Sequence, residues 1–228
     1  ATMEFGVGLF KASLSDGARY DTVRNCTFNM QRANFASGTS PMVEGSVAIL
    51  VINSTPTAAT TVLVPTAAAG SNSFNILHNN TTDNGHYGIV LSGYAASTPF
   101  TAADFGNQVL SNVISNFGGG TGSTNPSAGI RANNQWGIVI DNNTINNNTG
   151  TGVNHPSTLR GIFAQAGTSA NVTITNNTVT VQSGATSSEL HGINNGIGST
   201  AASNTVTISG NTIRNCTYSG ATTGVFYG

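Results

Sequence analysis

Short apolar runs alternate with polar residues along most of the chain, at the spacing of β-strands. Val172 and Ile174, like Val206 and Ile208, place β-branched side chains at every second position, so that one face of each run would be buried. The runs stop at Asn or Gly, which tolerate the left-handed backbone of a tight bend. No stretch follows the 3.6-residue period of an amphipathic helix. The pattern therefore predicts short strands joined by bends.

One six-residue motif recurs through the second half of the chain. It reads apolar, two polar residues, Asn, any residue, apolar, and its first position advances by 31, 34 and 34 residues. The Asn positions of these copies are Asn112, Asn143, Asn177 and Asn211. Looser copies upstream begin at Val23 and Ile76 and place Cys26 and Asn79 in the same column. Stacked amides in such a column can hydrogen-bond as a ladder.

A second series, Gly followed by Ile or Val, lies between the copies of the motif. Its glycines are Gly88, Gly129, Gly161, Gly192 and Gly224, with steps of 41, 32, 31 and 32 residues, and Gly6 opens the series. Two interleaved series with one period indicate a solenoid in which each repeat is covered by its neighbours. With strands rather than helices in the repeat, we predict an all-β, right-handed parallel β-helix with coils of 31–34 residues.

These motifs carry a family resemblance over most of residues 70–228. The chain resembles the right-handed parallel β-helix repeat proteins, in the broad sense that includes pectate-lyase-like folds. That scaffold hosts lyases, hydrolases, tailspikes and adhesins, so the resemblance implies a fold more than an activity. The Asn-, Thr- and Gly-rich, Lys-poor style is similar to large secreted surface proteins of Gram-negative bacteria, especially Bacteroidetes.

We expect a single domain over residues 1–228. Residues 1–45 carry seven of the fifteen charges and predict an irregular early coil, and residues 46–228 predict regular coils with loop insertions near 92–106 and 118–126. The 53 residues from Val23 to Ile76 fit one widened coil or two short ones, with strands at 47–52 and 61–64. Because neither end carries a capping helix, we expect the native chain to continue in at least one direction.

Composition narrows the classes of protein that fit. Asn, Thr, Ser and Gly make up close to half of the chain, which disfavours a helical bundle. The net charge of −1 leaves no basic patch for nucleic acid, and no apolar run is long enough for a membrane span. With 38% apolar residues, the chain is also richer in core-forming residues than disordered chains are.

Metal, cofactor and cross-link chemistry has little support in the sequence. Cys26 and Cys216 lie near opposite ends of the predicted stack, too far apart for a disulfide. No metal-binding motif occurs, so we expect no cofactor, with Ca²⁺ on loop carbonyls as the alternative. Lys11 is the only lysine, which leaves little scope for Lys–Asn isopeptide bonds.

One column of residues is a candidate binding site. The residue before each Gly-Ile pair is Tyr87, Ala128, Arg160, His191 or Thr223. Arg160 and His191 would be neighbours on adjacent coils, with Arg131 close by. Such a line could bind carboxylated or hydroxylated sugars, with Arg160 and His191 as the only candidates for catalysis. The alternative is a solvated polar column with no ligand.

The expected function is a structural or adhesive segment of a secreted or cell-surface bacterial protein, possibly contacting glycans. Its partners would be other segments of the same chain, cell-surface components or polysaccharide. A polysaccharide lyase or glycoside hydrolase is the alternative, although hydrolysis needs two facing carboxylates. Ice binding, from columns of Thr such as Thr173 and Thr207, and a phage tailspike are minor alternatives.

Overall fold

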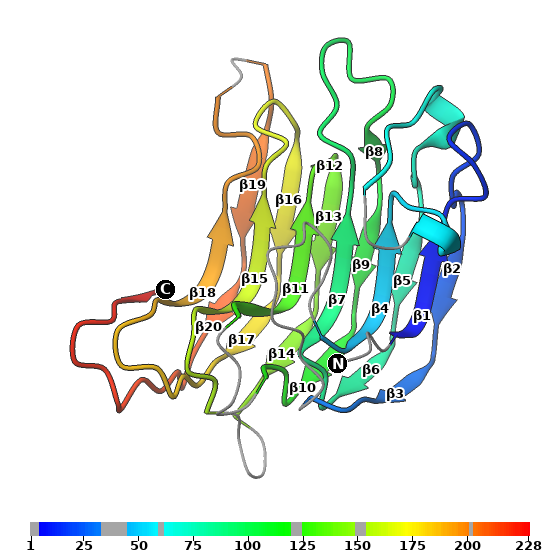
Figure 1. Cartoon of the computed structure of the whole chain (residues 1–228). Coiled ribbons are helices and arrows are strands. Elements are labelled where there is room, and N and C mark those ends of the chain that lie inside the picture. Colours follow the sequence, from blue (N-terminus) through cyan, green and yellow to red (C-terminus); the bar gives the residue numbers. More distant parts are fainter. Residues whose placement is uncertain (1–4, 33–44, 59–61, 120–124, 149–153, 201–202) are drawn as a thin grey trace.

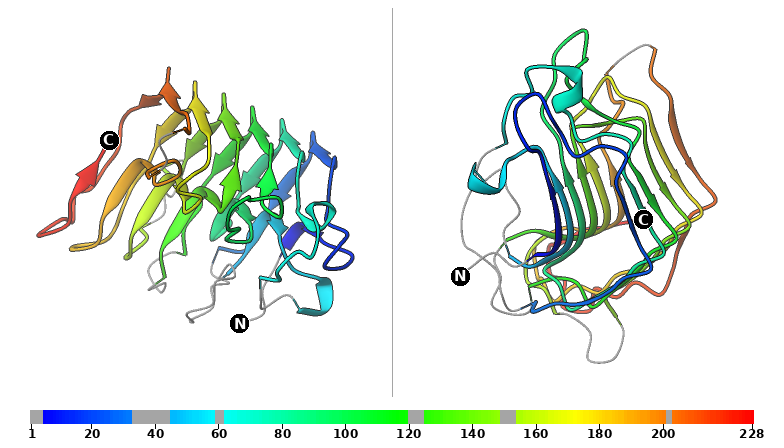
Figure 2. Two further views of the ribbon diagram at one scale, coloured as in Figure 1. Left: turned by 90° about the horizontal axis from the view of Figure 1, so that it is seen from above. Right: turned by 90° about the vertical axis from the view of Figure 1, so that its right-hand side faces the viewer.

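The chain winds into a stack of coils whose strands pair only with the coils above and below. The computed structural model describes residues 5–32, 45–58, 62–119, 125–148, 154–200 and 203–228. Every pairing between named strands is parallel, and the coils superimpose when viewed along the stack (Figure 2). The predicted all-β parallel β-helix is confirmed, and the model is compatible with the right-handed sense.

The longest sheet has seven strands and receives one strand from each coil (Figure 1). We call it the seven-stranded sheet. In order along the stack, its strands are β1 (Phe5–Phe10), β4 (Val47–Ile52), β7 (Tyr87–Ser92), β11 (Ser127–Asn133), β15 (Leu159–Gln165), β18 (Leu190–Asn195) and β21 (Phe226–Tyr227).

Two six-stranded sheets and one short sheet complete the wall of each coil. The first, here the β13 sheet, contains β2 (Thr22–Arg24), β5 (Ile76–His78), β9 (Gln108–Leu110), β13 (Ile138–Asp141), β16 (Val172–Thr175) and β19 (Val206–Ser209). The second, here the β14 sheet, contains β3 (Thr27–Asn29), β6 (Thr81–Asp83), β10 (Val113–Ser115), β14 (Thr144–Asn146), β17 (Thr178–Thr180) and β20 (Thr212–Ile213). The short sheet pairs β8 (Asp104–Phe105) with β12 (Gln135–Trp136).

The wide first turn of the stack is one coil rather than two. Strand β2 pairs directly with β5, with Thr22 opposite Ile76, so the intervening residues form a single widened coil. It holds two three-residue 3₁₀ helices, η1 (Pro56–Ala58) and η2 (Ala68–Gly70). The strand predicted at 61–64 is wrong for residues 62–64, where Leu63 makes an isolated backbone bond to Asn53 O, and Thr61 lies outside the described residues. No described helix is long and apolar enough to cross a membrane.

An asparagine ladder runs along the bend between the β13 and β14 sheets. Each Nδ2 donates to the Oδ1 of the next asparagine at 2.9–3.0 Å, and each backbone N–H donates to the same Oδ1. The ladder residues are Asn80, Asn112, Asn143, Asn177 and Asn211.

The placement of Asn79 in that column is wrong by one residue. Leu77, not Ile76, pairs with Val109, so Asn80 occupies the ladder and Asn79 provides the left-handed bend before it, with φ of 53°. Cys26 takes the ladder position in the first coil, where its N–H donates to Asn80 Oδ1. Cys26 and Cys216 are both half-buried free thiols.

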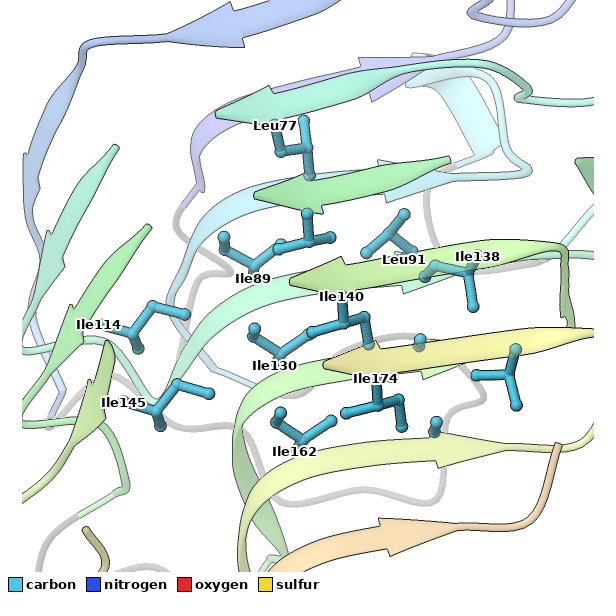
Figure 3. Packing of buried hydrophobic residues seen from close by; sticks show 14 of the residues in the cluster. Leu77, Ile89, Leu91, Ile114, Ile130, Ile138, Ile140, Ile145, Ile162 and Ile174 are labelled. Atoms are coloured by element: carbon cyan, nitrogen blue, oxygen red, sulfur yellow. The ribbon is translucent and has the colours of Figure 1, made fainter. Parts of the chain in front are cut away.

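Aliphatic side chains fill the inside of the stack. Figure 3 shows Ile130 and Ile162 of the seven-stranded sheet facing Ile140 and Ile174 of the β13 sheet, all with no exposed surface. Because the register is regular, identical residues lie above one another in columns. This core leaves the outer faces of the strands free for other contacts.

Candidate functional site

The predicted binding column lies on the outer face of the seven-stranded sheet. Arg160 pairs directly with His191, as predicted. The next member is Tyr227, which pairs with His191, so the assignment of Thr223 and Gly224 to this series is wrong. The backbone N–H groups of Thr223 and Gly224 both donate to Thr186 O, in a turn that delays the strand. Gly228 therefore stands where Gly224 was expected.

The first coils of this face are apolar and covered. Val47, Leu50 and Ile52 have no exposed surface, and they form a cluster with Val90 that is separate from the interior core. Tyr87 belongs to this cluster, 5% exposed, and its hydroxyl donates to Pro126 O at 2.7 Å. Of the predicted residues, Tyr87 therefore serves mainly as a wall.

Polar and aromatic residues replace the apolar ones in the later coils. We call this group the outer cluster: Tyr87, Arg131, Arg160, Phe163, Glu189, His191 and Tyr227. It comes from strands β7, β11, β15, β18 and β21 and the residue before β18. All four predicted site residues belong to it.

The two arginines lie against aromatic rings. Arg160 Cζ is 4.0 Å from the centre of the Phe163 ring, and Arg131 Cζ is 5.9 Å from that of Tyr87. Burial lowers the pKa of Arg160, Glu189 and Tyr87 oppose that shift, and Arg131 adds to it. The Nε atom of Arg160 is buried and makes no hydrogen bond within the described part of the chain. Cation–π contacts of this kind hold a guanidinium in place without neutralising it.

His191 is held by three neighbours. Its Nε2–H donates to Glu189 Oε2 at 2.9 Å, which leaves Nδ1 to accept from Asn194 Nδ2 at 3.3 Å. The imidazole stacks on Tyr227 with ring centres 4.7 Å apart and planes 13° apart. The Glu189 side chain is half exposed, whereas that of His191 is 9% exposed. Orientation by a carboxylate is a common arrangement for a functional histidine.

The chemistry available here is anion binding before hydrolysis. Two arginines can bind carboxylates, and the Tyr227 ring offers a flat apolar surface. Glycoside hydrolysis needs two carboxylates, and Glu189 is the only acidic residue of the described chain in the outer cluster. A carboxylate paired with a histidine beside an arginine is nevertheless the arrangement that a metal-independent lyase would use.

Sequence reasoning missed Glu189, Phe163 and Tyr227. Glu189 carried a usable signal, because residues two apart on a strand share a face and it precedes His191 by two. Phe163 pairs in register with Arg131, which its position two residues after Gly161 could have indicated. Tyr227 was hidden by the four-residue delay in the last turn.

A second recess lies beside the long loop that leaves β7. A cleft of about 240 Å³ is lined by Ala96 and Phe100 of this loop and by Asn134, Trp136 and Thr168 of later coils. The Phe100 and Trp136 rings are 5.4 Å apart. The predicted insertion near 92–106 thus contributes to a recess, whereas part of the one near 118–126 lies outside the described residues.

Two buried histidines lie at another corner of the coils. His86 and His155 have no exposed surface, and their ring centres are 5.8 Å apart. Burial lowers the pKa of His86 to about 4 and that of His155 to about 3, and the proximity of His86 adds to the shift of His155. Both rings are therefore neutral at pH 7.

Within the described ranges, no group of three or more His, Cys, Asp or Glu side chains is placed to hold a metal ion. Searches of protein-family models, of curated proteins and of solved structures found no match to this chain.

Proposed function

We propose that this chain is a structural or adhesive β-helix segment of a secreted or cell-surface bacterial protein, and that its outer cluster contacts acidic glycans. The observation that carries the proposal is the pair Arg131 and Arg160, held against aromatic rings on the outer face of the longest sheet. In a chain with only seven basic residues, two on adjacent strands of one face form a concentrated positive site.

Acidic polysaccharide fits this site better than neutral polysaccharide. A uronate carboxylate can accept paired hydrogen bonds from a guanidinium, and partial burial of Arg160 strengthens such a bond relative to one in bulk water. The 45% exposed ring of Tyr227 offers a stacking surface for a sugar ring. Hydroxyl groups can be bound by Asn194, which lies within hydrogen-bonding distance of His191.

The scaffold itself supports the structural part of the proposal. A stack of parallel coils is a rigid rod, and rods of this kind suit display and spacing at a surface. The resemblance to pectate-lyase-like β-helices and to Bacteroidetes surface proteins agrees with an extracellular location. On this proposal, the partners are neighbouring segments of the same chain, cell-surface components and acidic polysaccharide, rather than nucleic acid.

The test is binding of the whole chain to polygalacturonate and to uncharged dextran, by affinity electrophoresis. The double variant Arg131→Gln, Arg160→Gln should bind polygalacturonate at least about tenfold more weakly, a loss of about 1.4 kcal/mol. Arg24→Gln is the matched control, because Arg24 is exposed on the β13 sheet, away from the outer cluster. Equal binding by the double variant and the control, or no binding of polygalacturonate by the native chain, would contradict the proposal.

A lyase is the second candidate, favoured by the Glu189–His191 hydrogen bond beside Arg160. In that case, His191 or Glu189 removes a proton next to a uronate carboxylate that Arg160 neutralises. Incubation with polygalacturonate should then produce unsaturated sugars absorbing in the ultraviolet, and Glu189→Gln should reduce the rate at least about a hundredfold. Binding without any product leaves the adhesive function and excludes the lyase on this substrate.

A further inference from the structure

A group of fully buried polar side chains lies inside the stack, away from the outer cluster. We call it the buried polar corner: Lys11, Asn53, Asn72, Asp104 and Gln135, each at most 0% exposed. Lys11 and Asn53 directly follow strands β1 and β4, and Asp104 and Gln135 begin β8 and β12. The proposed glycan contact uses none of them, so the inference below does not depend on it.

The only lysine of the chain is enclosed without a partner. Lys11 has no exposed surface, and within the described residues its Nζ makes no hydrogen bond. The only ion pair in the described chain is Glu189–His191, so Asp104 influences Lys11 without direct contact. Burial lowers the pKa of Lys11, and the nearby Asp104 opposes that shift. A buried amine without a counter-ion favours its neutral form, which is a nucleophile.

Asn53 is the neighbour of Lys11 on the next coil. Phe10 pairs with Ile52, and Lys11 and Asn53 are the residues that follow this pair. The backbone fixes both, because Lys11 N–H donates to Ser54 O and Asn53 N–H to Ser92 O, each at 3.0 Å. Asn53 Oδ1 is also buried and has no hydrogen-bond partner among the described residues. An amide with a free carbonyl therefore lies beside an amine with no partner.

Asp104 links the two side chains. It is fully buried, and burial raises its pKa to about 7, against hydrogen bonds from Asn72, Asn53 and Gln135 and the charge of Lys11. A large share of the carboxyl is thus protonated near neutral pH. The Asn53 amide lies 2.5 Å from Asp104 Oδ1, a separation typical of an O–H···O bond. A half-turn of the amide places its Oδ1 there, as the acceptor of the Asp104 proton.

We propose that Lys11 and Asn53 form an intramolecular isopeptide bond, and that Asp104 promotes the reaction. The neutral Lys11 Nζ attacks Asn53 Cγ while the Asp104 carboxyl donates a hydrogen bond to the amide oxygen. Asp104 then transfers a proton from Nζ to Nδ2. The Nζ–Cγ bond forms, the Cγ–Nδ2 bond breaks, and one ammonia leaves. Nothing is oxidised or reduced, so no co-reactant is needed.

The mass of the intact purified chain tests this proposal. The native chain should be lighter than its sequence by one ammonia, and peptide mapping should find Lys11 joined to Asn53. Because the chain has one lysine, an amine-reactive reagent in denaturant should label only the N-terminus. The full sequence mass, together with a labelled Lys11, would overturn the proposal.

Two variants separate this cross-link from other ways of losing ammonia. Lys11→Met keeps an unbranched chain of similar length and should restore the mass to that of its sequence. If the ammonia loss persists in this variant, it comes from succinimide formation at another asparagine, and the proposal fails. Asp104→Asn should leave Lys11 unlinked and reactive in denaturant, and a cross-link formed at the native rate would remove Asp104 from the mechanism. The decisive measurement on the native chain needs neither variant to fold.

Discussion

At the scale of single residues, the asparagine ladder explains why this chain uses Asn so heavily at one position of each coil. Asn143 shows the pattern. Its Oδ1 accepts from Asn112, and its Nδ2 donates both to Asn177 Oδ1 and to Val109 O. No other small side chain offers a donor and an acceptor in this geometry. The ladder thereby satisfies backbone groups that the bend would otherwise leave buried and unpaired.

Replacing Asn143 with Leu should destabilise the chain by about 3 kcal/mol or more, because each unpaired buried polar group costs about 1–3 kcal/mol. Urea unfolding monitored by circular dichroism measures the change. Asn142→Gly is the matched control. Asn142 is exposed with φ of 56°, and glycine adopts that conformation without strain. The control should change stability by less than about 1 kcal/mol, and similar losses in both variants would contradict the ladder's role.

His155 should make the chain sensitive to acid. Its pKa is about 3 when folded against 6.5 when unfolded, so the unfolded state takes up a proton first as the pH falls below 6.5. Stability is complete above pH 6.5 and decreases toward pH 4, by up to about 1.4 kcal/mol per pH unit. Asp104, with its raised pKa, has the opposite sign, as its contribution is lost when the pH rises toward 7.

The variant His155→Asn isolates this effect. It retains an acceptor near the position where Nδ1 receives the Gly119 N–H, and Asp104 contributes equally to both proteins. Urea midpoints at a series of pH values between 4 and 7 should vary less steeply for the variant than for the native chain. Parallel curves would show that His155 does not titrate on unfolding.

At the scale of elements, the glycine column of the seven-stranded sheet sets how closely its strands approach the β14 sheet. A Cβ on Gly161 would lie 2.3 Å from Val179 Cγ1 and 2.6 Å from Gly192 O. Gly161→Ala should therefore cost about 1–3 kcal/mol through overpacking, measured by urea unfolding. Gly228→Ala, whose Cβ would meet nothing within 4 Å, should be neutral. A neutral result at Gly161 would mean that β15 can move outward freely.

Much of the element plan could be predicted from the sequence. The strand at 47–52 is β4 to the residue, and the Arg160–His191 neighbours were expected from the repeat. Errors arose where two residues offered the same signal. Asn79 and Asn80 both fit a bend, as Gly224 and Gly228 both fit the column. Spacing alone cannot choose between such residues, because backbone hydrogen bonds set the register.

The candidate site was less predictable than the fold. Arg131, Arg160 and His191 were found through the repeat, but Glu189 precedes its strand and Tyr227 follows an irregular turn. Lys11 gave no signal either, because lysines are rarely fully buried and its partner Asp104 is 93 positions away by numbering (104 minus 11). Such contacts depend on how distant coils superimpose.

At the scale of the whole molecule, each coil contacts only its neighbours, so stability should vary along the stack. Ile174 and Ile208 occupy one column, yet Ile174 is fully buried and Ile208 is 47% exposed. Ile174→Ala should cost about 2–5 kcal/mol, and Ile208→Ala less than about 1 kcal/mol. Urea unfolding compares the two, and equal costs would contradict a stability that follows burial.

The parallel pairing of the strands also determines how the rod responds to force. The hydrogen bonds between coils run along the stack, so tension applied at the two ends loads the bonds of one coil at a time instead of shearing all of them together. Stretching would unwind the rod coil by coil, each step releasing on the order of 100 Å of chain. Such a rod would absorb mechanical work gradually and rewind when the load falls, as a tether between a cell and a moving surface must.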